Sequence, residues 1–476
     1  MRNARPIPWT TAEILEATGG ELLCGELQRS FAQVFIDSRK VASDGVFIAI
    51  VGEIHDGHTF AADVVQQGVR GLVISRREMD RLPIGQWQQK GVATVAVADT
   101  TRALGDMAGF NRKRSRISVV AVTGSNGKTT TRQMTAAVIS QQFNTLATAG
   151  NFNNQIGLPL TLLDLEPAHQ WAVVELGTNA PGEIARLTEI CAPDVGVITN
   201  IGPAHLQGLG SIEGVAREKG SLLKGLLPDG KAVLNADDFR VRQLARQAAC
   251  DVLLYGFAPD AAVSAQDVAA NGAGISFRLK LASESISVRL NACGRFMVTN
   301  ALAAAAVGTL LALPAAKIKA GLETFVPVGG RMNIQHTPQA IHIIDDTYNA
   351  NPDSMKAALA TLKTMRAGAR AIFVAGDMLE LGPQAPSLHS QVGALAAQSG
   401  ISRLYACGTY AESVASGARD AGLPAADAIT GSREEIIADL IAWLKPGDWV
   451  LVKGSRGMAM EKVVAGLKAW SEETGN

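Results

Sequence analysis

The chain is poor in cysteine and in aromatic residues, and it carries no excess of charge of either sign. Its five cysteines are scattered over 476 residues without a C-x-x-C pair. This spacing argues against a disulfide framework or a zinc site and suits a reducing cytoplasm. Lysine and arginine (44) balance aspartate and glutamate (44). No overall field therefore attracts nucleic acid or an anionic membrane, and we expect neither as a partner.

Long hydrophobic runs are also missing. The apolar segment 301–313 is too short to span a bilayer and stops at Pro314, so it predicts a buried helix. The first residues, Met-Arg-Asn-Ala-Arg-Pro, lack the apolar core of a signal peptide. We therefore expect a cytoplasmic protein with no integral membrane segment.

The length of the chain is too great for a single core, and about three domains are expected. With 47% hydrophobic residues and many alanines and glycines, the composition is typical of an α/β protein. We predict a small mixed α/β N-terminal domain, a central parallel-sheet domain with a phosphate loop, and a Rossmann-like C-terminal domain. Their expected ranges are 1–115, 116–326 and 327–476.

The N-terminal block opens and closes with local signals. Thr10-x-x-Glu13 is a capping box that starts a helix, and Gly19-Gly20 is a C-terminal stop. The basic run 112–116 predicts a solvated linker rather than a nucleic-acid patch. Strands are expected between these signals at 46–51, 71–75 and 94–98.

The two later blocks share one pattern, in which Val/Ile/Leu-rich runs alternate with helical stretches. Such runs indicate parallel strands whose sheet is covered on both faces. In the central block they predict strands at 117–122, 171–176, 195–200, 231–235 and 252–255. In the last block they predict strands at 341–345, 371–375, 403–407 and 449–452.

A glycine-bearing turn follows the first central strand, in the stretch from Ile117 to Thr131. The backbone N–H groups of such a turn and the helix N-terminus after it attract phosphate. Lys128 can reach the outer phosphates, and the Thr129 hydroxyl can bind Mg²⁺. The usual pattern has glycine where this chain has Val122, and the alternative is an ordinary turn with incidental glycines. The strand–turn–helix context favours phosphate binding.

The carboxyl ends of parallel strands meet at one rim, where ligands of open sheets bind. Beside the phosphate loop, this rim should carry Glu175, the run Asn200-Ile-Gly-Pro-Ala-His205 and the run Asn235-Ala-Asp-Asp238. A carboxylate at the end of a buried strand favours Mg²⁺ binding over helix capping. His205 alone could equally be a satisfied loop histidine. By its spacing, Lys219 is a surface lysine on an amphipathic helix.

Taken in order, these motifs resemble the ATP-dependent Mur ligases of bacterial peptidoglycan synthesis. The central motifs are Thr123-Gly-Ser-Asn-Gly-Lys-Thr-Thr130, Glu175-Leu-Gly-Thr-Asn179, Asn200–His205 and Asn235–Asp238. Asp37-Ser-Arg39 and Gly52-x-x-x-Asp56-Gly-His58 resemble the nucleotide-sugar domain of that family. The C-terminal motifs are Asp345-Asp-Thr-Tyr-Asn-Ala-Asn-Pro352, Gly376-Asp-Met-Leu-Glu-Leu-Gly382 and Lys453-Gly-Ser-Arg456.

The resemblance implies an activity. A monomeric enzyme would join D-alanyl-D-alanine to UDP-N-acetylmuramoyl-tripeptide, using ATP and two Mg²⁺ ions. The tripeptide carboxylate would attack the γ-phosphate to give an acyl phosphate, which the amine of the dipeptide then attacks. Catalysis would rest on positioning and charge neutralisation.

The resemblance also implies roles for individual residues. The catalytic set would be Lys128, Glu175, His205 and Lys219. The metal ligands would be Thr129, Glu175, His205 and Lys219, the last as a carbamate, since a charged ammonium cannot bind a cation. ATP would contact Gly124, Ser125, Asn126, Gly127, Lys128, Thr129, Thr130, Asn300 and Arg331. The other substrates would contact Ser38, Arg39, Asp56, His58, Asp346, Tyr348, Asn349, Asn351 and Lys453.

Several alternatives stay open at this point. Where the family commonly has a His-Asn pair after Gly-Arg, this chain has Phe296 and Met297, which changes the adenine pocket. A family member that adds a single amino acid as the third stem residue is one rival. A nucleotide-binding regulator without ligase activity is another. The third residue of the tripeptide could be diaminopimelate or lysine.

Overall fold

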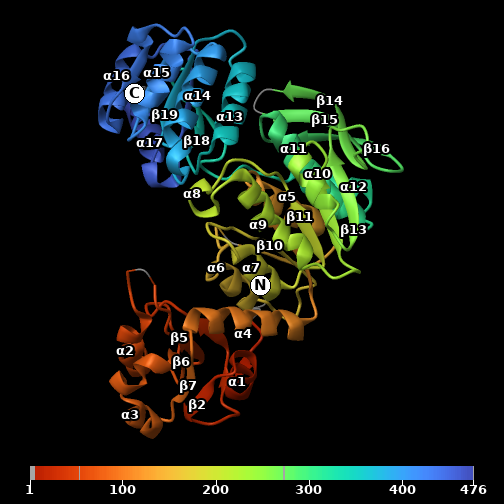
Figure 1. Ribbon diagram of the computed structural model, residues 1–476, viewed down its shortest axis with the longest axis vertical. Helices are drawn as coiled ribbons and strands as arrows, with labels where there is room; N and C mark the ends of the chain where they lie inside the picture. The colour runs from red at the N-terminus through yellow and green to blue at the C-terminus, as the bar shows by residue number, and fades with distance from the viewer. Residues whose placement is uncertain (1–5, 53, 149, 272–273, 475–476) are drawn as a thin grey trace.

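The computed structural model describes residues 6–52, 54–148, 150–271 and 274–474 and shows three α/β units (Figure 1). The N-terminal unit lies at one end of the long axis, the central unit in the middle and the C-terminal unit at the other end. The α/β class with three units is confirmed. The predicted domain boundaries remain a proposal, and at the chain ends they extend to residues 1–5 and 475–476, outside the described residues.

The N-terminal unit is built on a five-stranded sheet in the order β2-β7-β6-β5-β4. The strands β4 to β7 are parallel, and β2 is antiparallel to β7. The strands are β1 (Trp9–Thr10, paired with β3), β2 (Glu21–Cys24), β3 (Ser30–Phe31), β4 (Gln33–Phe35), β5 (Gly45–Ile48), β6 (Gly71–Ser75) and β7 (Ala93–Val97). The helices are α1 (Thr11–Thr18), η1 (Gly57–Phe60), α2 (Ala61–Gln66), η2 (Arg76–Arg81), α3 (Ile84–Gln89) and α4 (Thr100–Ser115).

The signals at the start of this unit are confirmed. Thr10 caps α1 with its hydroxyl, Glu13 returns a hydrogen bond to the Thr10 N–H, and the helix stops at Gly19, where φ is 60°. Only a residue without Cβ adopts this left-handed backbone without strain.

The basic run 112–116 is not a linker. It forms the last turn of α4, which ends at Arg116. Arg112 donates to the carbonyl groups of Cys191 and Ala192 at the end of α7, which form an electronegative helix terminus. Arg114 pairs with Glu13 at 2.8 Å and lies over the Trp9 ring. The charges that suggested a solvated segment thus join the N-terminal and central units.

The central unit is built on a nine-stranded sheet in the order β16-β15-β14-β13-β12-β11-β8-β10-β9. The strands β8 to β14 are parallel, and β15 and β16 extend the sheet in antiparallel fashion. The strands are β8 (Ser118–Thr123), β9 (Thr145–Ala147), β10 (Trp171–Glu175), β11 (Val195–Ile198), β12 (Lys231–Asn235), β13 (Asp251–Gly256), β14 (Val263–Asn271), β15 (Gly274–Lys280) and β16 (Ser285–Leu290).

Two groups of helices accompany this sheet. One group packs around α5 and the other joins α4 to α7 and α9. The first consists of α5 (Lys128–Ile139), α11 (Arg295–Leu310) and α12 (Ala315–Glu323). The second consists of α4, α6 (Gly157–Leu163), α7 (Glu183–Cys191), α9 (Ile212–Lys224) and α10 (Phe239–Ala245), with the short α8 (Leu206–Leu209) before α9.

The C-terminal unit is built on a six-stranded sheet in the order β17-β18-β22-β19-β20-β21, in which only β17 is antiparallel to its neighbour. The strands are β17 (Asn333–His336), β18 (His342–Asp346), β19 (Ala371–Gly376), β20 (Arg403–Cys407), β21 (Ala428–Thr430) and β22 (Trp449–Lys453). The helices are α13 (Pro352–Met365), η3 (Gly382–Gln384), α14 (Ala385–Gln398), α15 (Ala411–Asp420), η4 (Ala425–Asp427), α16 (Arg433–Trp443), η5 (Arg456–Met458) and α17 (Glu461–Thr474).

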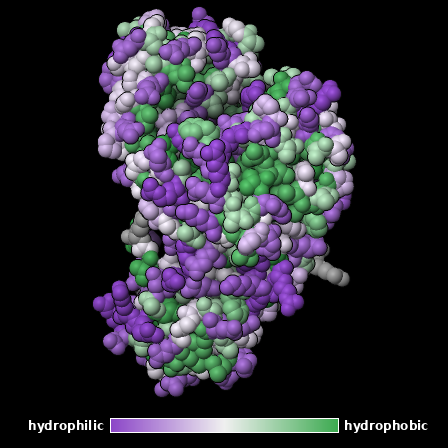
Figure 2. All heavy atoms as spheres, turned by 45° about the vertical axis from the view of Figure 1, so that its right-hand side comes forward, coloured by the Kyte–Doolittle hydropathy of each residue, from purple (hydrophilic) through white to green (hydrophobic). Residues whose placement is uncertain are grey.

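Burial follows the expectations from composition. Most of α11 is buried, including all of the alanines from Ala301 to Ala306, so the apolar segment is a core helix as predicted. The five cysteines are free. Among the helices of the described ranges, none combines the length and apolar character needed to cross a membrane. Figure 2 shows one face of the molecule, largely hydrophilic, with an apolar area on the central unit.

Candidate active site

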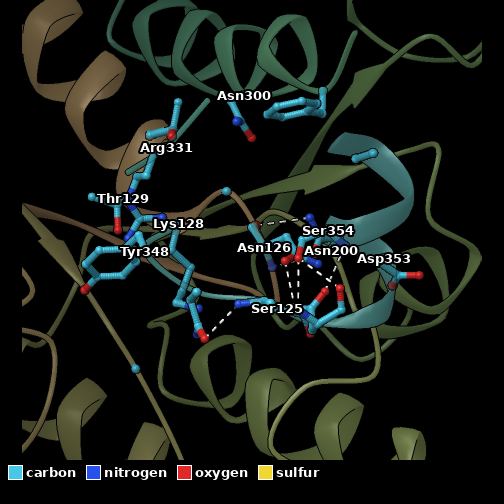
Figure 3. Close-up of a pocket in the computed structure, with 18 of the residues that line it drawn as sticks. Ser125, Asn126, Lys128, Thr129, Asn200, Asn300, Arg331, Tyr348, Asp353 and Ser354 are labelled. Carbon is cyan, nitrogen blue, oxygen red and sulfur yellow. Dashed lines mark hydrogen bonds between the residues drawn. The ribbon is translucent and has the colours of Figure 1, made fainter. Parts of the chain in front are cut away.

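A cavity of about 560 Å³ lies where the central and C-terminal units meet. One side is formed by the phosphate loop, Glu175 and His205, and the other by the loop after β18 and Lys453. In Figure 3, Arg331 and Tyr348 lie on the same side as Lys128 and Thr129, while Asn300 projects from its helix toward them. The rim predicted for the central sheet is therefore one half of a two-sided site.

The phosphate loop has the backbone that its glycines allow. Gly124 has φ of 150°, and a Cβ there would lie 1.8 Å from the Thr199 hydroxyl oxygen. Gly127 has φ of 77°, and its Cβ would lie 2.4 Å from Asn300 Oδ1. Both positions need glycine for conformation and for space. Val122 is buried within β8, opposite Glu175, so the departure from the usual pattern lies in the strand.

The loop is held from the end of β11. Asn200 Oδ1 accepts a hydrogen bond of 2.8 Å from the Asn126 N–H, and the Asn200 amide group donates to the Asn126 carbonyl oxygen. The Thr199 hydroxyl donates to the same carbonyl at 2.6 Å, and the Ser125 hydroxyl donates to the Gly202 carbonyl. These bonds fix the loop before a phosphate arrives, which lowers the cost of ordering it on binding.

Three cations gather at the start of α5. Lys128 Nζ donates to the Gly124 carbonyl at 2.8 Å, and burial lowers the pKa of its ammonium. Burial also lowers the pKa of Arg132. The guanidinium of Arg331, 3.9 Å from the centre of the Tyr348 ring, adds positive charge that lowers both pKa values further. This concentration of positive charge is what a triphosphate would neutralise.

Glu175 is 2% exposed at the end of β10 and is held by three side chains. The Thr129 hydroxyl donates to its Oε2 at 2.8 Å, and the Asn153 amide donates to its Oε1 at 2.8 Å. Arg132 Nε lies 3.7 Å from Oε2. A hydroxyl and a carboxylate in contact beside a phosphate loop are a donor set that Mg²⁺ accepts together with nucleotide phosphates. The residues therefore fit the expected ion.

Asn153 and Arg132 were not among the predicted site residues. Asn153 follows β9, and the rule that strand ends meet at one rim applies to it as it does to Glu175. β9 has only three residues and gives no strong signal in the sequence. Arg132 lies one helical turn after Thr129, on a position that the motif leaves unspecified.

His205 lines the same cavity as Glu175 but is held by the C-terminal unit. It has left-handed backbone angles just before α8, and its Nδ1 contacts Glu380 Oε2 of the C-terminal unit at 2.5 Å. This hydrogen bond lowers the pKa of Glu380. Within the described residues no three His, Cys, Asp or Glu side chains converge in a way that could hold a metal ion. The assignment of a second metal ion to His205 therefore stays a prediction.

Lys219 is not a surface residue. It lies on α9 with 0% of its surface exposed, and its Nζ has no hydrogen-bond partner among the described residues. Burial lowers its pKa well below the usual value, and the charge of Lys128 adds to this effect. Its neighbour Glu218 accepts hydrogen bonds from the Gly182 and Ile184 N–H groups at the start of α7. The chain thus buries an amine without a hydrogen-bond partner among the described residues, near the phosphate loop.

The C-terminal side of the cavity is organised around Lys453, at the end of β22. Its Nζ pairs with Asp346 at 2.6 Å and donates to the Asn349 carbonyl at 2.9 Å. Asn351 caps α13 and also donates to Asn126 Oδ1 of the phosphate loop at 2.8 Å. Four of the predicted substrate contacts therefore lie together, and one of them touches the nucleotide loop directly.

The residues expected around adenine border the cavity. Asn300 Oδ1 accepts a hydrogen bond from the Thr131 hydroxyl at 3.3 Å, and Phe296 and Met297 form an apolar wall. Asn235 also lines the cavity, and both Asn235 and Asp238 make hydrogen bonds that hold the fold. The Asn235 amide donates to the Thr199 carbonyl, and Asp238 caps α10 while accepting from the Ile201 N–H.

The predicted substrate contacts of the N-terminal unit lie outside this cavity. The Arg39 side chain is 84% exposed and pairs with Asp37, lowering the pKa of Asp37 to about 2. Ser38 lies between them in the same turn. His58 is buried, with Nδ1 at 2.6 Å from Asp56 and Nε2 accepting from the Ser75 N–H at 2.8 Å. Both its ring nitrogens are used within the unit, so Asp56 and His58 support a loop.

Comparisons with known proteins agree with this geometry. Residues 122–308 match the model of the Mur ligase middle domain, and residues 330–456 match that of the Mur ligase glutamate ligase domain. The chain is 38% identical to the UDP-N-acetylmuramoyl-tripeptide–D-alanyl-D-alanine ligase of Escherichia coli (strain K12), over 94% of this chain and 97% of that protein. It is 33% identical to the protein of the same name from Bacillus subtilis (strain 168), over 96% and 98%.

Solved structures give the same result. A crystal structure of MurF from Acinetobacter baumannii superposes with a TM-score of 0.89 and 32% identity, covering 98% of this chain and 100% of that one. MurF ligase from Thermotoga maritima, in complex with ADP, superposes with a TM-score of 0.82 and 25% identity, covering 93% and 98%. The chain therefore belongs to the Mur ligase family, whose members are ATP-dependent ligases that form carbon–nitrogen bonds.

Proposed function

We propose that this enzyme joins D-alanyl-D-alanine to UDP-N-acetylmuramoyl-tripeptide at the expense of ATP, giving the pentapeptide precursor of peptidoglycan with ADP and phosphate. One observation carries the proposal. A single cavity is lined by the phosphate loop of the central unit and by the loop from Asp346 to Asn351 of the C-terminal unit. A nucleotide on the first surface and an incoming amine on the second would meet at the same point. The names of the relatives supply the two substrates.

The residues of the chain account for the chemistry. The tripeptide carboxylate attacks the γ-phosphorus of ATP, the bond to the β-phosphate oxygen breaks, and ADP leaves. Lys128 and Arg331 neutralise the charge on the transferred phosphoryl group. The amine of the dipeptide then attacks the acyl phosphate, loses a proton, and expels inorganic phosphate. The loop held by Asn200 and Asn351 keeps the reacting groups in place.

Mg²⁺ would be held by Thr129 and Glu175 together with the nucleotide phosphates, and it supplies positive charge to the transferring phosphoryl group. We assign the triphosphate to the loop from Gly124 to Thr130 and the adenine ring to the wall formed by Asn300, Phe296 and Met297. A second ion at His205 remains part of the proposal.

We also propose that Lys219 carries a carbamate in the active enzyme. Its neutral, unpartnered amine would attack carbon dioxide, forming an N–C bond and releasing one proton. The anionic product would satisfy a buried nitrogen and place negative charge near Lys128. A neutral amine is the form that this reaction requires, and burial supplies it.

The three ranges 1–115, 116–326 and 327–476 then have separate tasks. We assign the UDP-sugar to the N-terminal range through Ser38 and Arg39, ATP to the central range, and the dipeptide to the C-terminal range through Asp346, Tyr348, Asn349, Asn351 and Lys453. We place the reaction in the cytoplasm, where ATP is available, and expect a monomer.

The test is a reconstituted ligation. Purified enzyme receives ATP, Mg²⁺ and UDP-N-acetylmuramoyl-tripeptide, ending in either diaminopimelate or lysine, with D-alanyl-D-alanine or single amino acids as acceptors. We expect phosphate release and a product heavier by one dipeptide residue only with D-alanyl-D-alanine, measured by mass spectrometry. A parallel reaction replaces the tripeptide with UDP-N-acetylmuramoyl-dipeptide, and ligation of a single amino acid to it would support the rival ligase. ADP release that ignores the acceptor would contradict any ligase.

A further inference from the structure

Among the described residues, no side-chain hydrogen bond joins His205 to its own unit. It lies between β11 and the four-residue helix α8, with φ of 55° and ψ of 33°, and its side chain caps no helix end. Its imidazole borders the cavity and is 19% exposed. Among the described residues, the hydrogen-bond partner of this ring is Glu380, which comes from the C-terminal unit. The orientation of the ring therefore depends on a contact between units.

Glu380 arrives on a loop that is fixed within the C-terminal unit. The Met378 N–H donates to His389 Nε2 at 2.9 Å, and the Leu379 N–H donates to the Ser455 hydroxyl at 2.9 Å. Asp377, at the start of the loop, accepts hydrogen bonds from the Thr409 and Tyr410 N–H groups. The loop ends where the Glu380 backbone adopts φ of 63°, in the left-handed region. This backbone conformation fixes the direction in which the Glu380 side chain leaves the loop.

The two units also meet through the main chain at this point. The N–H of Gln207, two residues after His205, donates to the Glu380 carbonyl oxygen at 2.9 Å. In Figure 1, α8 lies at the edge of the central unit that faces the C-terminal unit. Glu380 thus binds the start of α8 through its carbonyl group and contacts the preceding histidine through its carboxylate.

The contact determines which imidazole nitrogen carries a proton. An ionised carboxylate only accepts hydrogen bonds, so Nδ1 of His205 must donate to Glu380. A proton fixed on Nδ1 leaves Nε2 as the nitrogen that can face substrate or metal. Carboxylates behind functional histidines set tautomer and ring orientation in this way.

We propose that Glu380 is the positioning residue of His205, so that the imidazole acquires its working tautomer and orientation only when the C-terminal unit is seated on the central unit. For its effect on the rate, this inference rests on the proposed ligation.

The first test does not depend on activity. Nitrogen-15 NMR of labelled histidine side chains is recorded for the substrate-free enzyme at pH 8, and His205→Asn identifies the His205 signals by their loss. We expect Nδ1 of His205 to be protonated in the wild type, and expect Glu380→Ala to shift the proton to Nε2. Unchanged His205 signals in Glu380→Ala and in Glu380→Gln would overturn the proposal.

The second test is a double-mutant cycle in the ligation assay. We expect Glu380→Gln to lower kcat about 10–100-fold, the usual loss when such a carboxylate is removed, with KM for the UDP-tripeptide unchanged. In the His205→Asn background the same change should leave kcat almost unchanged. Equal losses in both backgrounds would overturn the proposal. Glu434→Gln, an exposed carboxylate on α16, is the matched control and should leave kcat unchanged.

The two tests separate the possible failures. A wild-type enzyme that ligates nothing would refute the proposed function, while the NMR measurement would still decide the role of Glu380. The melting temperature of each variant checks the fold, and the half-exposed Glu380 side chain should tolerate glutamine.

Discussion

Two buried lysines of this enzyme have opposite surroundings. Lys453, at the end of β22 in the C-terminal unit, pairs with Asp346 and donates to the Asn349 carbonyl. Lys219, on α9 of the central unit, is at least as deeply buried and has no hydrogen-bond partner in the described parts of the chain. A buried ammonium without a partner costs several kcal/mol, so such a residue loses its proton instead.

The two lysines therefore differ in their hydrogen bonding. Lys453 holds the loop after β18 through an ion pair and a hydrogen bond. Lys219 has no hydrogen-bond partner among the described residues, and burial is the main cause of its lowered pKa. The family resemblance suggests carbamylation at this position, and the unsatisfied nitrogen is the physical reason to expect it. The predictions below test this contrast.

The largest effect is expected at Lys219. Replacement by methionine should lower kcat by about 10²–10³-fold, the usual loss when a buried electrostatic contact to the transition state is removed. The free energy of unfolding should not fall, because an unsatisfied polar group costs about 1–3 kcal/mol when buried. Steady-state kinetics and urea unfolding measure the two quantities.

A control for this prediction uses Lys219→Ala with added formate or acetate, which should restore part of the activity by replacing the carbamate. Full activity of Lys219→Arg, together with an alanine variant that no carboxylate rescues, would show that the nitrogen carries no carbamate.

The next effect concerns stability at Lys453. Lys453→Met leaves Asp346 without its counter-ion in a partly buried place, and we expect a loss of about 3–5 kcal/mol in the free energy of unfolding. Removing both charges in Asp346→Asn/Lys453→Met should recover most of that loss. If Lys453→Met were as stable as the wild type, this ion pair would not hold the loop, and the contrast with Lys219 would disappear.

A smaller effect is expected from pH at His389, a second uncharged buried base. Its Nε2 accepts from the Met378 N–H, and burial lowers its pKa. The histidine side chain has a pKa near 6.5 in the unfolded chain. Below that pH the unfolded state binds a proton that the folded state does not bind. Stability should therefore fall as the pH drops below about 6.5 and continue to fall toward the lowered pKa. Urea unfolding of the wild type against His389→Gln isolates this slope, which the variant should lack.

The smallest effect on stability is expected at the exposed pair of Arg39 and Asp37. Because solvent screens it, Arg39→Ala should leave the midpoint of urea unfolding unchanged. The KM for the UDP-tripeptide should rise about tenfold if Arg39 binds a phosphate, the worth of one charge-assisted hydrogen bond. An unchanged KM would remove Arg39 from the substrate site.

Much of the fold could be predicted from the pattern of apolar runs. β6, β12 and β20 have the predicted bounds, and the other predicted strands are found within a few residues. The strands β14, β15 and β16, which pair with one another in antiparallel fashion, were not predicted. Because such strands are exposed on one face, their alternating residues give no continuous apolar run.

Part of the candidate site could likewise be predicted from the sequence, and part could not. Lys128, Thr129 and Glu175 could be placed together because they follow parallel strands, and topology brings such ends to one rim. Glu380 could not be paired with His205, since 175 residues separate them and the contact joins two units. The run 112–116 was wrongly predicted as a linker because its partners, the carbonyl groups at the end of α7, are distant in sequence.

The sequence by itself determined the local chemistry of this enzyme: a phosphate loop that needs glycine at 124 and 127, a carboxylate at the end of β10, and strands that must be buried on both faces. These features depend on backbone conformation and apolar periodicity, which neighbouring residues specify. Tertiary structure alone decided that Lys219 is buried with no hydrogen-bond partner in the described ranges and that His205 is held from another unit. Burial and counter-ions depend on what packs nearby, and packing joins residues that the sequence keeps apart.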